Sequence, residues 1–231
     1  MRDLAVTFLF FFLIFYAVRK PFIGVAAWAW ISFAFPAGWA WGFSTNLRMN
    51  LTVAILTFVG YVFMRDKPTL KVDGSTILIF FLWCVALAAC LNSNSLLADH
   101  MWVKFEEFTK ILMLYFAILL IFNKKIHIDT LIWAIVLSIS SYGAMEALKF
   151  LLSFGGHRIK GIEGYMLTDR NDLAVAINMC IPLIIYLVFQ TQHKLIRLAL
   201  IGLAILNVIA IIGTYSRGGF IGLVILGIYF L

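Results

Sequence analysis

An arginine between two apolar runs is the residue of this sequence best suited to bind a negatively charged group. Arg217 lies in the stretch Gly-Thr-Tyr-Ser-Arg-Gly-Gly, residues 213–219, and hydrophobic residues flank that stretch on both sides. Its guanidinium group is planar, always charged and matched to phosphate oxygens, and the glycines let backbone amides approach a ligand closely. An arginine at such a boundary either reaches for lipid headgroups or forms part of a binding site. We favour a phosphate site that contains Arg217 and the neighbouring Ser216.

A second polar segment, residues 155–172, also carries groups that could bind an anion. Four glycines lie within residues 155–164, so the backbone there can turn tightly and approach a ligand. Taken one at a time, the basic side chains of the glycine-rich part could also be solvated loop charges. The candidate anion-binding side chains of the segment are His157, Arg158, Lys160 and Arg170.

Both polar segments lead directly into apolar runs that we expect to be helices. Thr168 or Asp169 is the expected N-cap of the first helix, and the second helix is expected to begin at Phe220. The first amides of a helix lack partners and carry a partial positive charge, so they attract anions. Two such helix ends would strengthen a phosphate site, and Asn171 at the first of them is a further candidate for substrate binding.

Glu146 and Lys149 are three residues apart near the end of an earlier apolar run. Residues at this spacing are neighbours on a helix surface, so the two side chains could form an ion pair that stabilises packing. The functional alternative is that Glu146 positions a loop arginine or an acceptor hydroxyl. The sequence leaves both interpretations open.

Polar residues inside the later apolar runs have structural explanations. Asn171, Ala174 and Asn178 recur at helical spacing, so they are expected to share one helix face that projects into the bundle. Pro182 is expected to kink the same helix. Asn207 most simply makes a hydrogen bond between two helices.

No metal ion or other cofactor is expected. The predicted outer loops contain no Asp-x-Asp element, and no His and Cys residues have the spacing of metal ligands. Cys84, Cys90 and Cys180 lie inside apolar runs without a CxxC pair, which is typical of small core residues rather than of disulfides.

The composition indicates which class of protein must position these residues. Of the 231 residues, 64% are hydrophobic and only 13% are charged, which is too few charges for a soluble domain. Apolar runs recur along the chain, and their backbone must be helical because lipid cannot satisfy unpaired amides. We therefore expect an all-α, polytopic transmembrane helical bundle that forms one domain over residues 1–231. The expected helices are residues 4–18, 22–35, 51–64, 76–91, 111–122, 131–154, 173–189 and 198–212, and a last helix that opens at residue 220.

The first two apolar runs are short for bilayer crossings, so they could form a hairpin rather than two full spans. Four tryptophans lie around Pro36, and an aromatic belt at the membrane interface is favoured over a platform for stacking a ligand. These tryptophans are Trp28, Trp30, Trp39 and Trp41.

The basic residues predict the orientation of the chain and argue against a nucleic-acid partner. The formal net charge of +7 comes from short clusters between apolar runs, with no continuous basic patch. By the positive-inside rule the most basic loops are cytoplasmic, which leaves residues 155–172 and 213–219 together on the outer side. The cytoplasmic clusters are Arg19 with Lys20, then Arg65, Lys67 and Lys71, then Lys124 with Lys125, then His193, Lys194 and Arg197.

Three elements in this order resemble the O-antigen ligase and polymerase superfamily. They are the basic segment His157-Arg158 with Gly161, the helix start Asp-Arg-Asn-Asp-Leu-Ala at residues 169–174, and the Ser-Arg-Gly element at Arg217. The N-terminal stretches at residues 2–4, 19–24 and 41–43 are more narrowly similar to the O-glycosylation ligases associated with exosortase A systems. The resemblance covers essentially the whole chain, with N-terminal helices in residues 1–130 and the first part of the ligase-like region in residues 131–231.

The resemblance implies a GT-C-like membrane glycosyltransferase of the bacterial inner membrane, with a periplasmic active site and a role in polysaccharide biosynthesis or protein O-glycosylation. Such enzymes move a glycan from an undecaprenyl-diphosphate carrier to a hydroxyl of a protein or of lipid A core, without a metal ion and with inversion. Arg217 matches the arginine implicated in engaging the donor diphosphate, and Arg158 matches a second basic position. Arg170 stands where the family commonly has proline. The remaining expected substrate-binding residues are His157, Lys160, Asn171, Ser216 and Glu146.

Three alternative functions remain, with one expectation about length. A polymerase of the same superfamily would use the same arginine with another lipid-linked glycan as acceptor, and a transporter of lipid-linked glycans would place basic residues near the midplane. A purely structural membrane subunit would tolerate substitutions at Arg217 and Arg158 without effect. The ligases continue into a large periplasmic loop with an acceptor-activating histidine. This sequence stops at Leu231 inside an apolar run, so it is expected to be an N-terminal fragment, with His157 a less favoured candidate for the base.

Overall fold

The computed structural model describes residues 2–39, 42, 45, 47–65, 67–69, 73–93, 98–162 and 167–230. Every regular element in these ranges is helical, which confirms the all-α expectation. The α-helices are α1 (Arg2–Arg19), α2 (Pro21–Ala34), α3 (Met49–Val62), α4 (Gly74–Leu91), α5 (Ala98–Ile121), α6 (Lys125–Ile135), α7 (Ser141–Leu152), α8 (Arg170–Gln190), α9 (Lys194–Gly213) and α10 (Arg217–Phe230). Two short elements are the 3-10 turn η1 (Pro36–Trp39) and the π-helical segment η3 (Val136–Ser140).

Among the described residues, four helices are long and apolar enough to cross a membrane. They are α4, the continuous helix α6–η3–α7 (Lys125–Leu152), α8 and α9. The helices α2, α3 and α10 are apolar but shorter. The chain therefore has the helices of an α-helical membrane protein, as its composition predicted.

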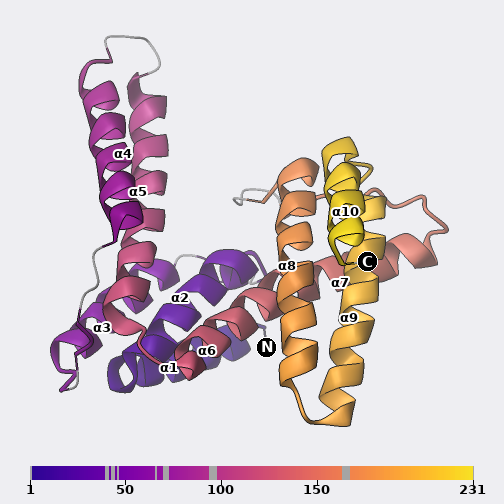
Figure 1. The fold of residues 1–231 in the computed structure, drawn as a ribbon, viewed down its shortest axis with the longest axis horizontal. Coiled ribbons are helices and arrows are strands. Elements are labelled where there is room, and N and C mark those ends of the chain that lie inside the picture. Colours follow the sequence, from indigo (N-terminus) through magenta and orange to yellow (C-terminus); the bar gives the residue numbers. More distant parts are fainter. Residues whose placement is uncertain are drawn as a thin grey trace.

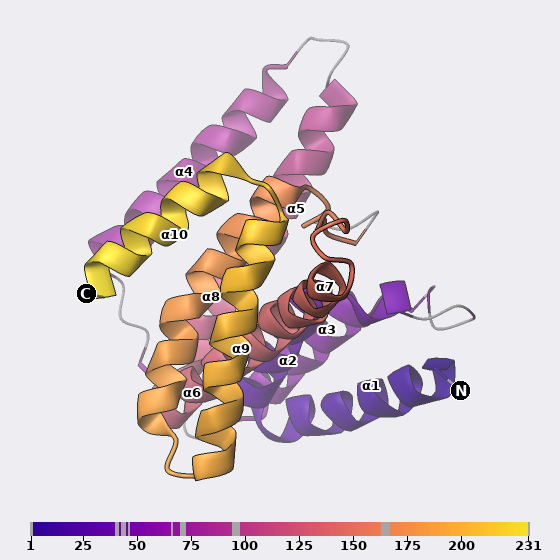
Figure 2. The same ribbon diagram turned by 90° about the vertical axis from the view of Figure 1, so that its right-hand side faces the viewer.

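The helices form two packed groups and one projecting hairpin (Figure 1). In the first group, α1 and α2 form a hairpin joined at Lys20 that packs on α3, as the short first runs allowed. In the second group, α8 and α9 lie side by side, α7 packs on α9, and α10 packs on α8 (Figure 2). The α4–α5 hairpin extends away from both groups.

The helix α6–η3–α7 connects the two groups. Its first part packs on α2, and its last part packs on α9. The π-helical segment η3 lies at the middle of this helix and contacts both α2 and α8. A π-helical turn carries an extra residue, which widens the helix locally and commonly occurs at functional sites. The sequence predicted one helix over residues 131–154, but it did not predict this segment.

Small residues let the helices approach closely, as in other membrane bundles. A Cβ added at Gly24 of α2 would lie 2.3 Å from the hydroxyl of Thr57 on α3. A Cβ added at Gly60 would lie 2.7 Å from the backbone carbonyl of Val18 on α1. These distances leave no room for a side chain, so both glycines are required by packing.

The helix α5 begins at Ala98, well before the predicted start at residue 111. Its first part is charged, and the charges pair along the helix surface: Lys104 contacts Glu107 at 2.8 Å, and Lys110 contacts Glu106 at 2.7 Å. The hydrogen bond from Lys110 also lowers the pKa of Glu106. Pairs at this spacing support a solvated helix, so α5 continues beyond its apolar part.

Two structural expectations require correction. Trp28 is buried at 7% exposure and packs edge-on to Phe58 in the core of the first group, so it does not belong to an interfacial belt. Asn207 donates to the carbonyl of Leu203 in its own helix rather than across helices. Its Oδ1 instead faces Gly143 of α7, where an added Cβ would lie 2.5 Å away. Trp41, part of the predicted belt, lies outside the described residues.

Candidate functional site

The start of α8 is fixed by Asp169, one of the two predicted N-caps. Its carboxylate accepts a hydrogen bond of 2.7 Å from the amide of Asn171. Thr168 instead donates to the carbonyl of Ile162 and so holds the loop that precedes the helix. The helix therefore begins at Arg170, and that side chain stands in the first turn of α8.

The start of α10 is fixed by Ser216, which the sequence did not predict as a cap. The Ser216 hydroxyl accepts a hydrogen bond of 3.1 Å from the amide of Gly219. Tyr215, with φ of 52°, turns the chain into this position after α9. The helix consequently begins at Arg217 rather than at the predicted Phe220, because the serine satisfies an amide of the first turn.

The two helix starts are in direct contact. The Ser216 hydroxyl donates to Oδ1 of Asn171 at 2.8 Å, and the side-chain amide of Asn178 donates to the carbonyl of Gly219 at 2.9 Å. A Cβ added at Gly219 would lie 2.6 Å from the Cβ of Ala174. The predicted polar face of α8, made by Asn171, Ala174 and Asn178, therefore exists, and it packs against the first turn of α10.

The glycine-rich basic segment, residues 155–162, packs against the end of α9 and the start of α10. The amide of Ile159 donates to the carbonyl of Gly213 at 3.0 Å, and the Tyr215 hydroxyl donates to the carbonyl of Gly155 at 3.0 Å. The Ile159 side chain is fully buried against the end of α9. The predicted meeting of the two polar segments is confirmed for the described residues 155–162, 167–172 and 213–219, which lie at one end of the second helix group (Figure 2).

Three arginines adjoin the residues of this contact in the sequence, and we call Arg158, Arg170 and Arg217 the arginine cluster. Each arginine immediately precedes or follows a residue of the contact, namely Ile159, Asn171 or Ser216. Arg158 and Arg217 are exposed, and Arg170 is half-buried. Within the described residues, none of the three forms an ion pair with a carboxylate.

The predicted Glu146–Lys149 ion pair is present, and it has a third member. Glu146 is buried, and its Oε1 accepts from Nζ of Lys149 at 2.6 Å. Its Oε2 lies 2.7 Å from Nε2 of His157, while the His157 amide donates to the hydroxyl of Ser153. Glu146 therefore positions a loop histidine rather than an arginine. The effect is to fix the start of the basic segment to α7.

Lys160 is the remaining predicted site residue, and its backbone is fixed by the same helix, α7. The Tyr142 hydroxyl of α7 donates to the Lys160 carbonyl at 2.8 Å. Tyr142 was not predicted, because it lies inside the continuous helix Lys125–Leu152, although a tyrosine has the polar tip that such an anchor needs. The lysine side chain itself is exposed.

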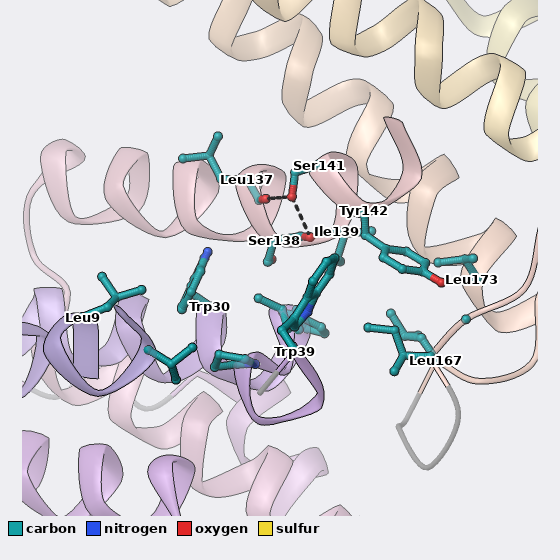
Figure 3. A pocket seen from close by; sticks show the side chains of 16 residues that line it. Leu9, Trp30, Trp39, Leu137, Ser138, Ile139, Ser141, Tyr142, Leu167 and Leu173 are labelled. Atoms are coloured by element: carbon teal, nitrogen blue, oxygen red, sulfur yellow. Dashed lines mark hydrogen bonds between the residues drawn. The ribbon is translucent and has the colours of Figure 1, made fainter. Parts of the chain in front are cut away.

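A partly open cavity of about 260 Å³ lies behind the basic segment, and it was not predicted (Figure 3). It is lined by α1, α2 and η1 on one side and by η3 and α7 on the other. Gly161, Ile162 and Leu167 also line it. The arginine cluster and this cavity therefore share one segment of chain as their boundary.

Three comparisons with known proteins bear on the chain. Residues 1–192 match a family model described as a family of unknown function (DUF5935). No curated protein and no solved structure matches the chain.

Proposed function

We propose a function for this chain, which belongs to the family of unknown function DUF5935, from the residues around Arg217, because the family description states no activity. The proposal is a GT-C-like membrane glycosyltransferase of the O-antigen ligase or O-oligosaccharyltransferase type. It would act at the periplasmic face of the bacterial inner membrane. It would transfer a glycan from an undecaprenyl-diphosphate carrier to a hydroxyl of a protein or of lipid A core.

The arginine cluster is the observation that carries the proposal. Arg170 and Arg217 are the first residues of α8 and α10, and Arg158 precedes Ile159, whose amide bonds to the end of α9; within the described residues no carboxylate pairs with the three arginines. Guanidinium forks and free helix amides are the donors that bind phosphate oxygens in proteins. A diphosphate carries enough negative charge to engage several such groups at once. The site therefore suits the diphosphate of a lipid-linked sugar.

The site would promote the reaction by electrostatic stabilisation of the leaving group. When an acceptor hydroxyl attacks the anomeric carbon, its proton passes to a general base, the bond from that carbon to the diphosphate oxygen breaks, and negative charge grows on the departing diphosphate. Arg217 and Arg158 would stabilise that charge. The Ser216–Asn171 hydrogen bond would hold Arg217 in place, because it fixes the residue that precedes the arginine.

The test is Arg217→Ala in cells in which the variant is the sole copy of the protein. Loss of one group that stabilises the leaving charge typically costs about 10²–10³-fold in rate, so glycan transfer should fall by that factor. Arg197→Ala is the matched control, since Arg197 is an exposed arginine at the opposite end of α9. It should leave transfer unchanged.

Near-normal transfer by Arg217→Ala, with the protein inserted in the membrane at its usual level, would contradict the proposal. The product identifies the acceptor class. Glycan on a protein or on lipid A core supports a ligase, whereas a lengthened lipid-linked glycan would replace the ligase with a polymerase.

A further inference from the structure

The cavity behind the basic segment is bounded by side chains from distant parts of the chain. Leu9 of α1 and Trp30 of α2 lie on one side, and Leu137 of η3 lies on the other (Figure 3). Trp39 and Tyr142 lie beside these side chains, on the side of Leu167 and Leu173, with their rings edge to face at a centroid distance of 6.4 Å. The widened turn of η3 faces the cavity, so the π-helical segment contributes directly to its shape.

Four of the polar side chains around the cavity bond to the backbone. Trp39 Nε1 donates to the carbonyl of Ala34 at 3.0 Å, and the Tyr142 hydroxyl donates to the carbonyl of Lys160. The hydroxyls of Ser138 and Ser141 donate to carbonyls of their own helix. The rest of the lining is mainly aliphatic and aromatic carbon, with the indole Nε1 of Trp30 as a further polar atom. Such a cavity suits a hydrocarbon chain and does not suit a sugar or an ion.

Two segments of the chain contribute residues both to the cavity lining and to the arginine cluster. Gly161 in the cavity wall is three residues from Arg158, and Leu173 in the wall lies one turn into the helix that begins at Arg170. A single lipid with its charge next to its chain can therefore occupy both. A polyprenyl diphosphate has this arrangement, because its charged group is attached directly to the branched chain. A glycerophospholipid carries one phosphate charge, separated from its chains by glycerol.

We infer that this cavity binds the first isoprene units, those next to the diphosphate, of the polyprenyl lipid whose diphosphate lies on the arginine cluster. The inference rests on the proposed function and names the part of the donor that the helices α1, α2 and η3 recognise. Tyr142 then has a positioning role, because it forms part of the chain-binding wall and also fixes the backbone of the basic segment at Lys160.

The test compares two ligands on the purified protein in nanodiscs of phosphatidylcholine. Undecaprenyl diphosphate reports on chain and charge together, and inorganic diphosphate reports on charge alone. Leu137→Trp fills the cavity from η3, and it should weaken undecaprenyl diphosphate binding by about tenfold, the equivalent of about 1.4 kcal/mol. It should leave the affinity for inorganic diphosphate unchanged.

Leu148→Trp is the matched control. Leu148 is 49% exposed and Leu137 is 48% exposed, and both belong to the same long helix, but Leu148 does not line the cavity. The control should bind both ligands normally. Leu9→Trp fills the cavity from α1, and it should repeat the effect of Leu137→Trp independently.

The outcomes separate the two proposals. If Leu137→Trp and Leu9→Trp bind undecaprenyl diphosphate as tightly as the unaltered protein, the chain assignment is overturned. If phosphatidylglycerol binds equally well and responds equally to both variants, the cavity is a general lipid site and the polyprenyl assignment is overturned. If Arg217→Ala leaves the affinity for both diphosphates unchanged, the proposed function fails while the cavity result stands.

Discussion

At the scale of single residues, the Ser216 hydroxyl has two hydrogen-bond partners, whereas the side chain of the next residue, Arg217, is exposed. It donates to Asn171 and accepts from Gly219, so it joins the starts of α8 and α10. Arg217, the next residue, is exposed and makes no ion pair with any described carboxylate. Ser216 is therefore a structural residue of the site, and Arg217 is its proposed ligand-binding residue.

This distinction predicts different consequences for two neighbouring substitutions. Ser216→Ala should destabilise the protein by about 1–2 kcal/mol, because a helix cap and a buried hydrogen bond are lost together. It should also weaken diphosphate binding. Arg217→Ala should weaken binding while it changes the free energy of unfolding by less than about 0.5 kcal/mol, as for most surface positions. Denaturant unfolding in detergent, combined with diphosphate titration, measures both quantities. Equal losses of stability in the two variants would refute the division of roles.

The residue-scale predictions succeeded where the partners are close in sequence. Asp169 as N-cap and the Glu146–Lys149 pair follow from local helix geometry. The contact between Glu146 and His157 did not follow, because the two residues lie on either side of a helix end and their meeting depends on the loop path. The same limit hid the bond between Tyr142 and Lys160.

At the scale of elements, the packing of α8 against α10 brings the two helix N-termini together. The contact is made by Ala174 against Gly219 and by Asn178 against the Gly219 carbonyl. The polar face of α8 was predicted from its spacing. Its partner, the first turn of α10, was not predicted, because the pattern of a helix face indicates that another element packs on it but does not identify that element.

Two adjacent glycines provide a matched test of this contact. Gly219→Ala would place a Cβ 2.6 Å from the Cβ of Ala174, whereas a Cβ at Gly218 has no atom within 4 Å. Gly219→Ala should therefore displace α10 and reduce diphosphate affinity, by roughly tenfold if the strain is within the usual overpacking range. Gly218→Ala should bind normally. Adding Ala174→Gly to the first variant should restore binding, and failure of this rescue would count against the close contact as the cause.

Helix positions were largely predictable from hydropathy, and helix ends were less so. The helix α5 extends through a charged stretch that its own ion pairs stabilise. The helix α10 begins directly after the Ser216 cap, three residues before the predicted start at Phe220. The π-helical segment η3 was not predictable, because an extra residue in one turn leaves the apolar pattern of a buried helix unchanged.

At the scale of the whole molecule, α9 separates two polar regions of the chain. It has 20 residues and so spans about 30 Å, the thickness of a bilayer core. Arg197 lies in its first turn, and the arginine cluster lies beyond its last residue, Gly213. The distribution of loop charge predicts that these two ends face opposite sides of the membrane.

Cysteine labelling tests this orientation in intact cells. Arg158→Cys should react with a membrane-impermeant maleimide from outside, while Arg197→Cys should react only after the membrane is permeabilised. The native cysteines make a low background, because Cys90 and Cys180 are buried and Cys84 is half-buried. Labelling of Arg197→Cys in intact cells would invert the predicted orientation.

The overall arrangement was the least predictable property. Composition and hydropathy predicted an all-helical membrane protein, but they contain no information on which helices form which group. The role of α6–η3–α7 as a bridge between the groups, and the cavity that forms beside it, depend on packing between residues far apart in the sequence.

The attachment of the basic segment has an energetic consequence. The segment is held at its start by Glu146 on His157, in the middle by Gly213 on Ile159, and after that by Tyr142 on Lys160. A free loop would lose backbone conformational entropy on binding, at a cost of about 1–2 kcal/mol for each residue whose backbone becomes fixed. Here most of the backbone ordering is complete before a ligand arrives. The site is preorganised, so the binding free energy of its arginines can be expressed as affinity for the anion rather than used to order the loop.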